Sequence, residues 1–263
     1  MASQAPNSLP LLYNNLEPLN RNRHANFKVR RSAGLDRMAN THAIPVTVDE
    51  FTMAQRHFPI VFSVGENSIP IALMGLHEGT NTFFSKEGAL LDPSIYVPAY
   101  LRRFPFMLAR LRDDSDELSL CFDPTADAIT EDGEGEPLFD GDQPSEATKA
   151  VLEFCEQFEQ AGQRTQAFMS ELKDMDLLMD GEVAIQPEGA QQPFIYRGFR
   201  MIDEEKFRNL RGDELRKMNQ SGMLPLIMAH MFSLSVIRDV FARQVMQGSG
   251  PAMPPAQPAT AEA

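Results

Sequence analysis

A long series of residues at helical spacing places the strongest limit on how this chain can fold. After Ser145, side chains suited to a buried face recur every three or four positions, at Val151, Phe154, Cys155, Phe158, Thr165, Phe168, Leu172, Met175 and Met179. An α-helix brings residues at this spacing onto one face, and serine is a favoured N-cap. The pattern predicts one long amphipathic helix, with Gly162 as the point where it could bend.

Short runs rich in Ile, Val and Phe precede that helix and predict β-strands. The first two runs are separated by a linker with Gly65 and Asn67, which is typical of a hairpin. A later run alternates apolar and polar residues from 117 to 123, as in a strand with one exposed face. The predicted strands are 57–64, 69–76, 81–85, 117–123, 183–187 and 193–202.

The C-terminal part is predicted to be helical. Asp203 and Asp213 are candidate caps of two short helices. A third helix is predicted after Gly222, where Pro225 falls in the first turn.

Strands early in the chain and helices late indicate an α+β fold. We expect a mostly antiparallel sheet with a long amphipathic helix and a C-terminal helical subdomain. Residues 1–40 are predicted to form an extended N-terminal arm, 41–247 a single domain, and 248–263 a disordered tail, since the tail is rich in Pro, Ala and Gly.

Negative charge is concentrated in one segment. The net charge is −13, and residues 113–146 hold thirteen acidic side chains and no Lys or Arg. The rest of the chain is balanced, and the first 37 residues lean basic. Residues 124–144 are therefore predicted to form a solvated acidic loop. An acidic protein with one small basic patch argues against nucleic acid as the main partner.

Cysteine usage and hydropathy bear on the compartment. Cys121 and Cys155 follow the apolar pattern of their segments, which favours buried free thiols and a reducing compartment. The N-terminus lacks the features of a secretory signal, and the most apolar run, 223–237, is short of a membrane span. We expect a soluble cytoplasmic protein, with the cell surface by a signal-independent route as the alternative.

Common catalytic and metal motifs are not found in the sequence. No glycine-rich nucleotide loop, nucleophile elbow or zinc-protease motif occurs. An EF-hand fails at Gly133, because Ala128 and Thr130 stand where carboxylates are required. We therefore predict no catalytic set, no cofactor and no metal site. His230 is interpreted as a core or interface histidine; a base role beside Ser233 is the alternative.

The stretch YVPAYLRRFPF, residues 96–106, combines two tyrosines, two phenylalanines, two prolines and two adjacent arginines. Pro98 and Pro105 keep the residues before them out of helical conformation. The residues between could form one helical turn that begins at Pro98. Alternatively the whole stretch is extended, with Arg102 between Tyr100 and Phe104.

Two interpretations of this stretch are open. In the structural one, one arginine stacks on the aromatic rings and pairs with a carboxylate, and the other is solvated. In the functional one, Arg102 or Arg103 presents its guanidinium to a carboxylate or phosphate. The candidate ligand-binding residues are Tyr96, Tyr100, Arg102, Arg103 and His77.

This stretch resembles the signature of the SapC family, small bacterial proteins of about this length. Further motifs agree in order over roughly residues 10 to 240. They are LLYNNLEPLNRNRH (11–24), HFPIVF (57–62), GLHEGTNTFF (75–84), LCFD (120–123), PLFD (137–140), DEEKFRNL (203–210) and GMLPLIMAHMFSL (222–234). The family takes its name from a protein associated with a bacterial surface layer, and the resemblance implies no catalytic residues.

Three functions are consistent with the sequence. The first is a non-enzymatic accessory or interaction protein whose partner is another protein; a homo-oligomer is an alternative assembly. The second is an enzyme, or an enzyme subunit, that binds an anionic ligand at Arg102 and Arg103. The third is a structural component of a surface layer.

Overall fold

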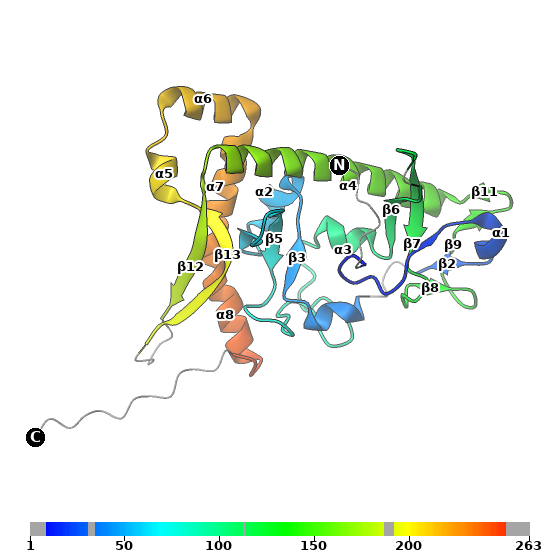
Figure 1. The fold of residues 1–263 in the computed structure, drawn as a ribbon. Helices are drawn as coiled ribbons and strands as arrows, with labels where there is room; N and C mark the ends of the chain where they lie inside the picture. The colour runs from blue at the N-terminus through cyan, green and yellow to red at the C-terminus, as the bar shows by residue number, and fades with distance from the viewer. Residues whose placement is uncertain (1–8, 31–34, 113, 187–191, 251–263) are drawn as a thin grey trace, which may run out of the picture.

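The computed structural model describes residues 9–30, 35–112, 114–186 and 192–250 of the 263-residue chain. Its largest sheet has five strands in the order β12-β13-β4-β5-β3, and every neighbouring pair is antiparallel (Figure 1). The strands are β3 (Ala43–Pro45), β4 (Ile60–Phe62), β5 (Pro70–Leu73), β12 (Leu178–Ile185) and β13 (Phe194–Ile202).

Smaller sheets lie at the other end of the molecule (Figure 1). One joins three strands in the order β1-β7-β6, one joins β8-β2-β9, and the last pairs β10 with β11. Their bounds are β1 (Glu17–Pro18), β2 (Lys28–Val29), β6 (Phe106–Arg110), β7 (Leu118–Phe122), β8 (Ile129–Thr130), β9 (Glu136–Pro137), β10 (Phe139–Asp140) and β11 (Gln143–Pro144).

Helix α4 (Glu146–Asp174) runs along both groups of sheets (Figure 1). Its C-terminal half contributes Phe168 and Leu172 to the main core, and its N-terminal half contributes Cys155 to a second core around Phe106 and Phe122. Ser145 caps the helix by accepting a hydrogen bond from the backbone of Thr148, as predicted. Gly162 lies inside the continuous helix.

The predicted helix is wrong at its C-terminal end, because Met179 belongs to β12. The helix stops at Asp174, and Asp176 takes a left-handed conformation with φ 51°. Leu177 then donates its backbone N–H to the carbonyl of Leu172, which closes the last turn as in a Schellman motif. Glycine is the usual residue at this position, so Asp176 carried no recognisable stop signal.

Among the other helices, those in the N-terminal part of the chain are short, and the last three are longer. They are α1 (Arg21–His24), α2 (Phe51–Ala54), α3 (Ala99–Arg103), α5 (Glu204–Arg208), α6 (Gly212–Ser221), α7 (Met223–Ser233) and α8 (Ile237–Met246), with 3-10 turns at Asp36–Asn40, Val48–Glu50 and Leu234–Val236. The Asp203 side chain caps α5, as predicted. Helix α6 instead begins after Arg211, whose N–H donates to the Glu214 carboxylate, so Asp213 is not its cap.

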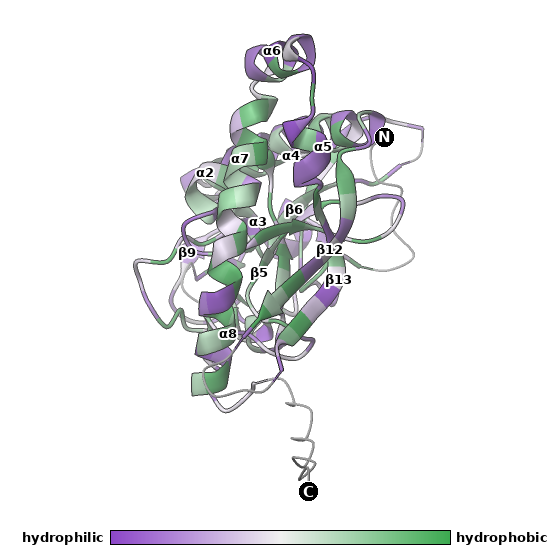
Figure 2. Ribbon diagram, turned by 90° about the vertical axis from the view of Figure 1, so that its left-hand side faces the viewer, coloured by the Kyte–Doolittle hydropathy of each residue, from purple (hydrophilic) through white to green (hydrophobic). Residues whose placement is uncertain are grey.

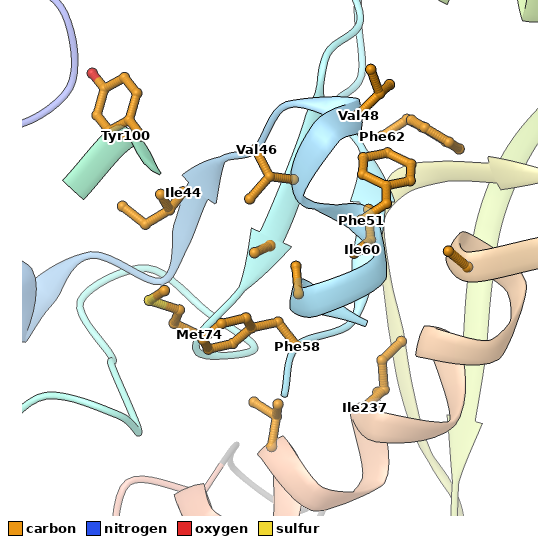
Figure 3. Close-up of a cluster of buried hydrophobic side chains, with 14 of the residues drawn as sticks. Ile44, Val46, Val48, Phe51, Phe58, Ile60, Phe62, Met74, Tyr100 and Ile237 are labelled. Carbon is orange, nitrogen blue, oxygen red and sulfur yellow. The ribbon is translucent and has the colours of Figure 1, made fainter. Parts of the chain in front are cut away.

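The main core lies between the five-stranded sheet, α4 and the α7–α8 pair. Phe51, Phe58 and Phe62 are fully buried there (Figure 3). Tyr100 of α3 reaches the edge of the same cluster near Ile44 (Figure 3). The short helix that carries both arginines is therefore anchored to the core.

Met223–Met246 forms one helical stretch that is apolar and long enough to cross a membrane by length and composition. Figure 2 shows its mixed hydropathy, and three of its polar side chains are fully buried: His230, Ser233 and Gln244. His230 and Ser233 bond to the backbone of Ile60, and Gln244 to that of Leu76. These contacts fit a helix that packs inside the fold.

The predicted strands have mixed outcomes. The 57–76 hairpin forms as β4 and β5, and β7 and β13 lie at the predicted positions. The strand predicted at 183–187 is confirmed only in part, because β12 begins at Leu178 and ends at Ile185. The strand predicted at 81–85 is wrong: the Asn81 side chain accepts hydrogen bonds from the N–H groups of Phe83 and Phe84, which curls the chain into a turn. Strand β3, which pairs with the free edge of β5, was not predicted.

The described part of the N-terminal arm and the acidic segment differ from simple loops. The described part of the N-terminal arm supplies β1 and β2 to two sheets. Glu131, Asp132 and Glu134 are exposed, as expected of the acidic loop, but short strands β8 to β11 occur there and Leu138 is fully buried. The predicted disordered tail lies outside the described residues from 251 onward.

Candidate functional site

The YVPAYLRRFPF stretch contains one helical turn, α3, directly after Pro98. Of the two predicted conformations, the helical one is confirmed and the extended one is wrong. Proline fixes a backbone angle suited to a helix start. The buried Glu50 carboxylate accepts hydrogen bonds from the Ala99 N–H at 2.6 Å and the Tyr96 hydroxyl at 3.0 Å. A negative charge at the first N–H groups of a helix turn stabilises it.

Arg103 is buried between two aromatic rings. The side chain is 6% exposed, and its guanidinium carbon lies 4.6 Å from the Tyr100 ring centroid and 4.2 Å from that of Phe158. Glu159 is the ion-pair partner at 3.7 Å, a distance beyond a normal hydrogen bond. The buried Nε atom has no hydrogen-bond partner among the described residues. Arg103 therefore matches the structural interpretation: stacked on rings and paired with a carboxylate.

Arg102 is exposed but held in place. Its Nε donates to the Val97 carbonyl at 3.1 Å, and its Nη2 donates to the Tyr96 hydroxyl at 3.2 Å. The guanidinium carbon lies 5.0 Å from the Phe154 ring centroid and 5.7 Å from that of Tyr96. Both hydrogen-bond acceptors are neutral. None of the ion pairs between described residues involves Arg102.

A cleft of about 490 Å³ opens beside Arg102. We call it the Arg102 cleft. Helix α4 supplies one wall, and Leu101, Phe104 and Phe106 supply another. Val29 of β2 closes it from the N-terminal arm. The charged lining residues are Arg30, Arg102, Arg103 and Glu136. Arg30 donates from Nη2 to the carbonyl of Asp127. The cleft is thus mainly apolar with a cationic edge.

The tyrosines of this site are neutral at ordinary pH. Burial, with the Glu50 charge as the next cause, raises the pKa of Tyr96 to about 12. Burial also raises the pKa of Tyr100, whose hydroxyl donates to the carbonyl of Leu11 in the arm. Burial raises the pKa of Glu159, and the nearby Arg103 opposes that shift. Neutral Tyr96 therefore donates to Glu50 and accepts from Arg102, and neutral Tyr100 donates to the arm.

His77, the remaining candidate residue, lies elsewhere. Its Nδ1 accepts a hydrogen bond from Gln244 Nε2 at 2.7 Å, so Nε2 carries the proton and donates to the Thr80 hydroxyl at 2.9 Å. Gln244 belongs to α8, and His77 is not among the residues that line the Arg102 cleft. The structure brings Tyr96, Tyr100, Arg102 and Arg103 together but leaves His77 outside.

His230 occupies the main core, as interpreted from the sequence. Its Nδ1–H donates to the Ile60 carbonyl at 2.7 Å and its Nε2 accepts from the Ile202 N–H at 3.1 Å. Burial lowers its pKa to about 4. The Ser233 hydroxyl donates to the His230 carbonyl instead of the ring. The pair therefore lacks the hydrogen bond that a base and nucleophile require.

A second groove of about 990 Å³ lies between the β4–β5 loop and the middle of α4. Its cations are Lys173 and Arg200, and Arg200 already donates to the carbonyl of Leu178. Across the described ranges, no group of three or more His, Cys, Asp or Glu side chains could hold a metal ion. Cys121 and Cys155 are buried free thiols, and burial raises the pKa of both.

Comparison with protein families matches residues 19–240 to the model described as SapC. The chain belongs to the SapC family. The SapC match spans the Arg102 cleft, including Arg30 in the arm, α3, and the wall supplied by α4. Comparison with curated proteins and with solved structures gives no significant match.

Sequence reasoning found the two arginines but missed most of their surroundings in this SapC chain. The missed residues are Glu50, Arg30, Glu159 and the α4 residues Ala147 and Ala150. One signal was present for α4, because Ala147, Ala150, Val151 and Phe154 stand at helical spacing. Nothing in the sequence linked Glu50 or Arg30 to residues 96–106.

Proposed function

We propose that this SapC-family chain is a non-enzymatic accessory protein that recognises an anionic group of its partner in the Arg102 cleft. The observation that supports it is the state of Arg102. The guanidinium is exposed at a mainly apolar cleft, held by two neutral acceptors and two rings, and takes part in none of the ion pairs between described residues.

A fixed cation in such a place favours anion binding for two reasons. Its hydrogen bonds and ring contacts fix the side chain before a ligand arrives, which reduces the entropy lost on binding. The apolar walls lower the local dielectric, which strengthens the attraction between the guanidinium and an anion. Arg103, in contrast, has a structural role: its buried guanidinium packs between two rings and holds α3 against the core.

The accessory role rests on how the candidate catalytic groups are engaged. His77 and His230 each have both ring nitrogens bonded inside the fold. Tyr96 and Tyr100, which support the arginines, have raised pKa values and donate their hydroxyl protons to Glu50 and Leu11. The enzyme alternative would need a proton-transfer group in the cleft, and no contact described above favours one. Cytoplasmic location and the surface-layer alternative stay predictions.

Thermal unfolding of the full chain with added anions tests the proposal. Acetate, butyrate and inorganic phosphate are compared with chloride at matched ionic strength. At least one of the three should raise the Tm, because a ligand that binds the folded state stabilises it. Arg102→Gln should remove that response, and Arg238→Gln, at an exposed position on α8, should keep it. An unchanged Tm for all three anions, or an equal response of Arg102→Gln, would refute the proposal.

A further inference from the structure

We infer that the group bound in the Arg102 cleft is a carboxylate carried on an apolar body. This inference rests on the proposed function and names the class of ligand. It follows from three features of the cleft: the donors that Arg102 has left, the single charge of its guanidinium, and the shape of the apolar walls.

The free edge of Arg102 matches a carboxylate. A guanidinium has five N–H donors in a planar fork. Val97 takes the one on Nε and Tyr96 takes one on Nη2, so both N–H groups of Nη1 and one of Nη2 remain. Two parallel N–H groups on that edge fit the two oxygens of a carboxylate in bidentate geometry.

The apolar surroundings favour a monoanion over a phosphate. A phosphate brings a second charge and a third terminal oxygen that need further donors. The two other arginines of the cleft are engaged: Arg30 donates to the Asp127 carbonyl, and Arg103 pairs with Glu159. The remaining described surface next to Arg102 is mostly carbon: Phe154, Val97 and Leu101. Burial of charge without enough partners is costly. A carboxylate places one charge against one guanidinium.

The rest of the cleft fits an apolar body. Ala147, Ala150, Val151 and Phe154 form one stripe of α4 at i, i+3, i+4 and i+7. Val29 and Phe106 lie on the other walls. The two alanines leave room that larger side chains would fill. The volume, about 490 Å³, lies within the range typical of small-molecule sites.

A chain-length series tests the class of ligand. Calorimetric titration of the full chain with acetate, butyrate, hexanoate and octanoate should show affinity that rises roughly fourfold for each methylene buried. Inorganic phosphate should bind more weakly than octanoate, and octanol should also bind more weakly because it lacks the charge. Equal affinity for acetate and octanoate, or tighter binding of phosphate, would overturn the inference and leave the anion site standing.

Variants separate the head group from the body. Arg102→Gln should weaken octanoate binding at least tenfold, and Arg102→Lys should restore only part of it because the fork is lost. Ala150→Phe, at an exposed helix position, should fill the cleft and weaken octanoate more than acetate. Equal loss of both acids in Ala150→Phe would contradict an apolar body in this cleft. Arg238→Gln serves as the charge control.

The apolar carboxylate could belong to a free acid or to the C-terminus of a partner protein, and a matched pair of peptides separates the two. A short peptide that ends in Leu-Leu is compared with the same peptide amidated at its C-terminus. Binding that needs the free carboxylate supports a protein C-terminus as the source. Octanoate binding without peptide binding supports a free acid. If neither the acids nor the peptide bind wild type but inorganic phosphate does, this inference fails and the proposed function stands. If phosphate does not bind either, both fail.

Discussion

Single polar side chains hold the segment that carries the arginines. The Glu50 carboxylate accepts from Ala99 and Tyr96, and Tyr96 in turn accepts from Arg102. A buried carboxylate therefore fixes an exposed guanidinium through one hydroxyl without neutralising it by direct contact. This arrangement explains why α3 forms, although five residues alone are too few for a stable helix.

His230 makes stability depend on pH in a defined window. Its pKa is about 4 in the folded chain, below the ordinary value of 6.5, so the unfolded chain binds more protons between those values. The free energy of unfolding should fall as pH drops from 6.5 toward 4, by about 3 kcal/mol from this group. Urea unfolding across that range measures it. His230→Gln should be less stable at pH 7 and show a shallower slope; an unchanged slope would contradict the assignment.

Gly181 is required by a close approach between β12 and β13. A Cβ atom at this position would lie 2.1 Å from the Phe199 ring, which is almost fully buried. The register of the two strands shifts at the same place. Gly181→Ala should therefore lower the free energy of unfolding by about 1–3 kcal/mol through strain. Urea unfolding gives the value, and a loss near zero would show that the ring can move freely.

At the scale of elements, the periodicity of the sequence located the elements with long or clearly bounded patterns. It failed where particular contacts determine the structure. Helix α4, the β4–β5 hairpin and β13 were located because their patterns are long or bounded by turn residues. The 81–85 strand was wrong because Asn81 bonds its own neighbours, and β3 was missed because three residues ending in proline give little pattern. The turn at 81–85 depends on side-chain hydrogen bonds, and β3 depends on pairing with β5, which is distant in the sequence.

Helix α4 offers a stabilising change at Gly162. This residue lies inside the helix, and nothing would come within 4 Å of an added Cβ. Gly162→Ala should raise the free energy of unfolding by about 0.5–1 kcal/mol, because alanine loses less backbone entropy in a helix. The same urea experiment as for Gly181→Ala measures it. The two alanine variants should therefore shift stability in opposite directions, and a destabilised Gly162→Ala would mean that the helix needs its glycine.

At the scale of the whole molecule, the N-terminal arm is tied to the centre of the chain by a buried carboxylate. Asp123 is fully buried and accepts from the Asn14 N–H at 2.8 Å and from Arg37 Nη1 at 2.7 Å. Thr125 donates to its other oxygen. These hydrogen bonds hold the pKa of Asp123 below its usual range, against the opposing effect of burial. The arm is part of the fold.

Removal of that charge should loosen the arm. Asp123→Asn should lower the free energy of unfolding at pH 7 by about 2–3 kcal/mol, because charged hydrogen bonds are lost and Arg37 loses its carboxylate partner. In wild type the stabilisation by Asp123 is present above the ordinary aspartate pKa and is lost as pH falls through the lower folded pKa. Limited proteolysis should cut Asp123→Asn faster within residues 9–30. The exposed Asp114→Asn is the control, and equal cleavage of both would contradict the role of Asp123.

Only part of the candidate site could be predicted from the sequence, because the rest depends on packing between distant segments. Adjacent arginines among aromatic residues could be seen along the chain, and so could one face of α4. The meeting of residue 30, residue 102 and residue 150 in one cleft depends on how the arm, α3 and α4 pack. No local pattern encodes that packing, and His77 was grouped with the arginines although it bonds to α8.

The contribution of the arm to the cleft has a consequence for synthesis on the ribosome. Val29 and Arg30 emerge early, but Asp123 and the α4 wall, which ends near residue 154, emerge more than ninety residues later. The arm cannot form its contacts with Asp123 and α4 until these segments have left the exit tunnel. Under the proposed function, recognition by the cleft would begin only once more than half of the polypeptide has been made.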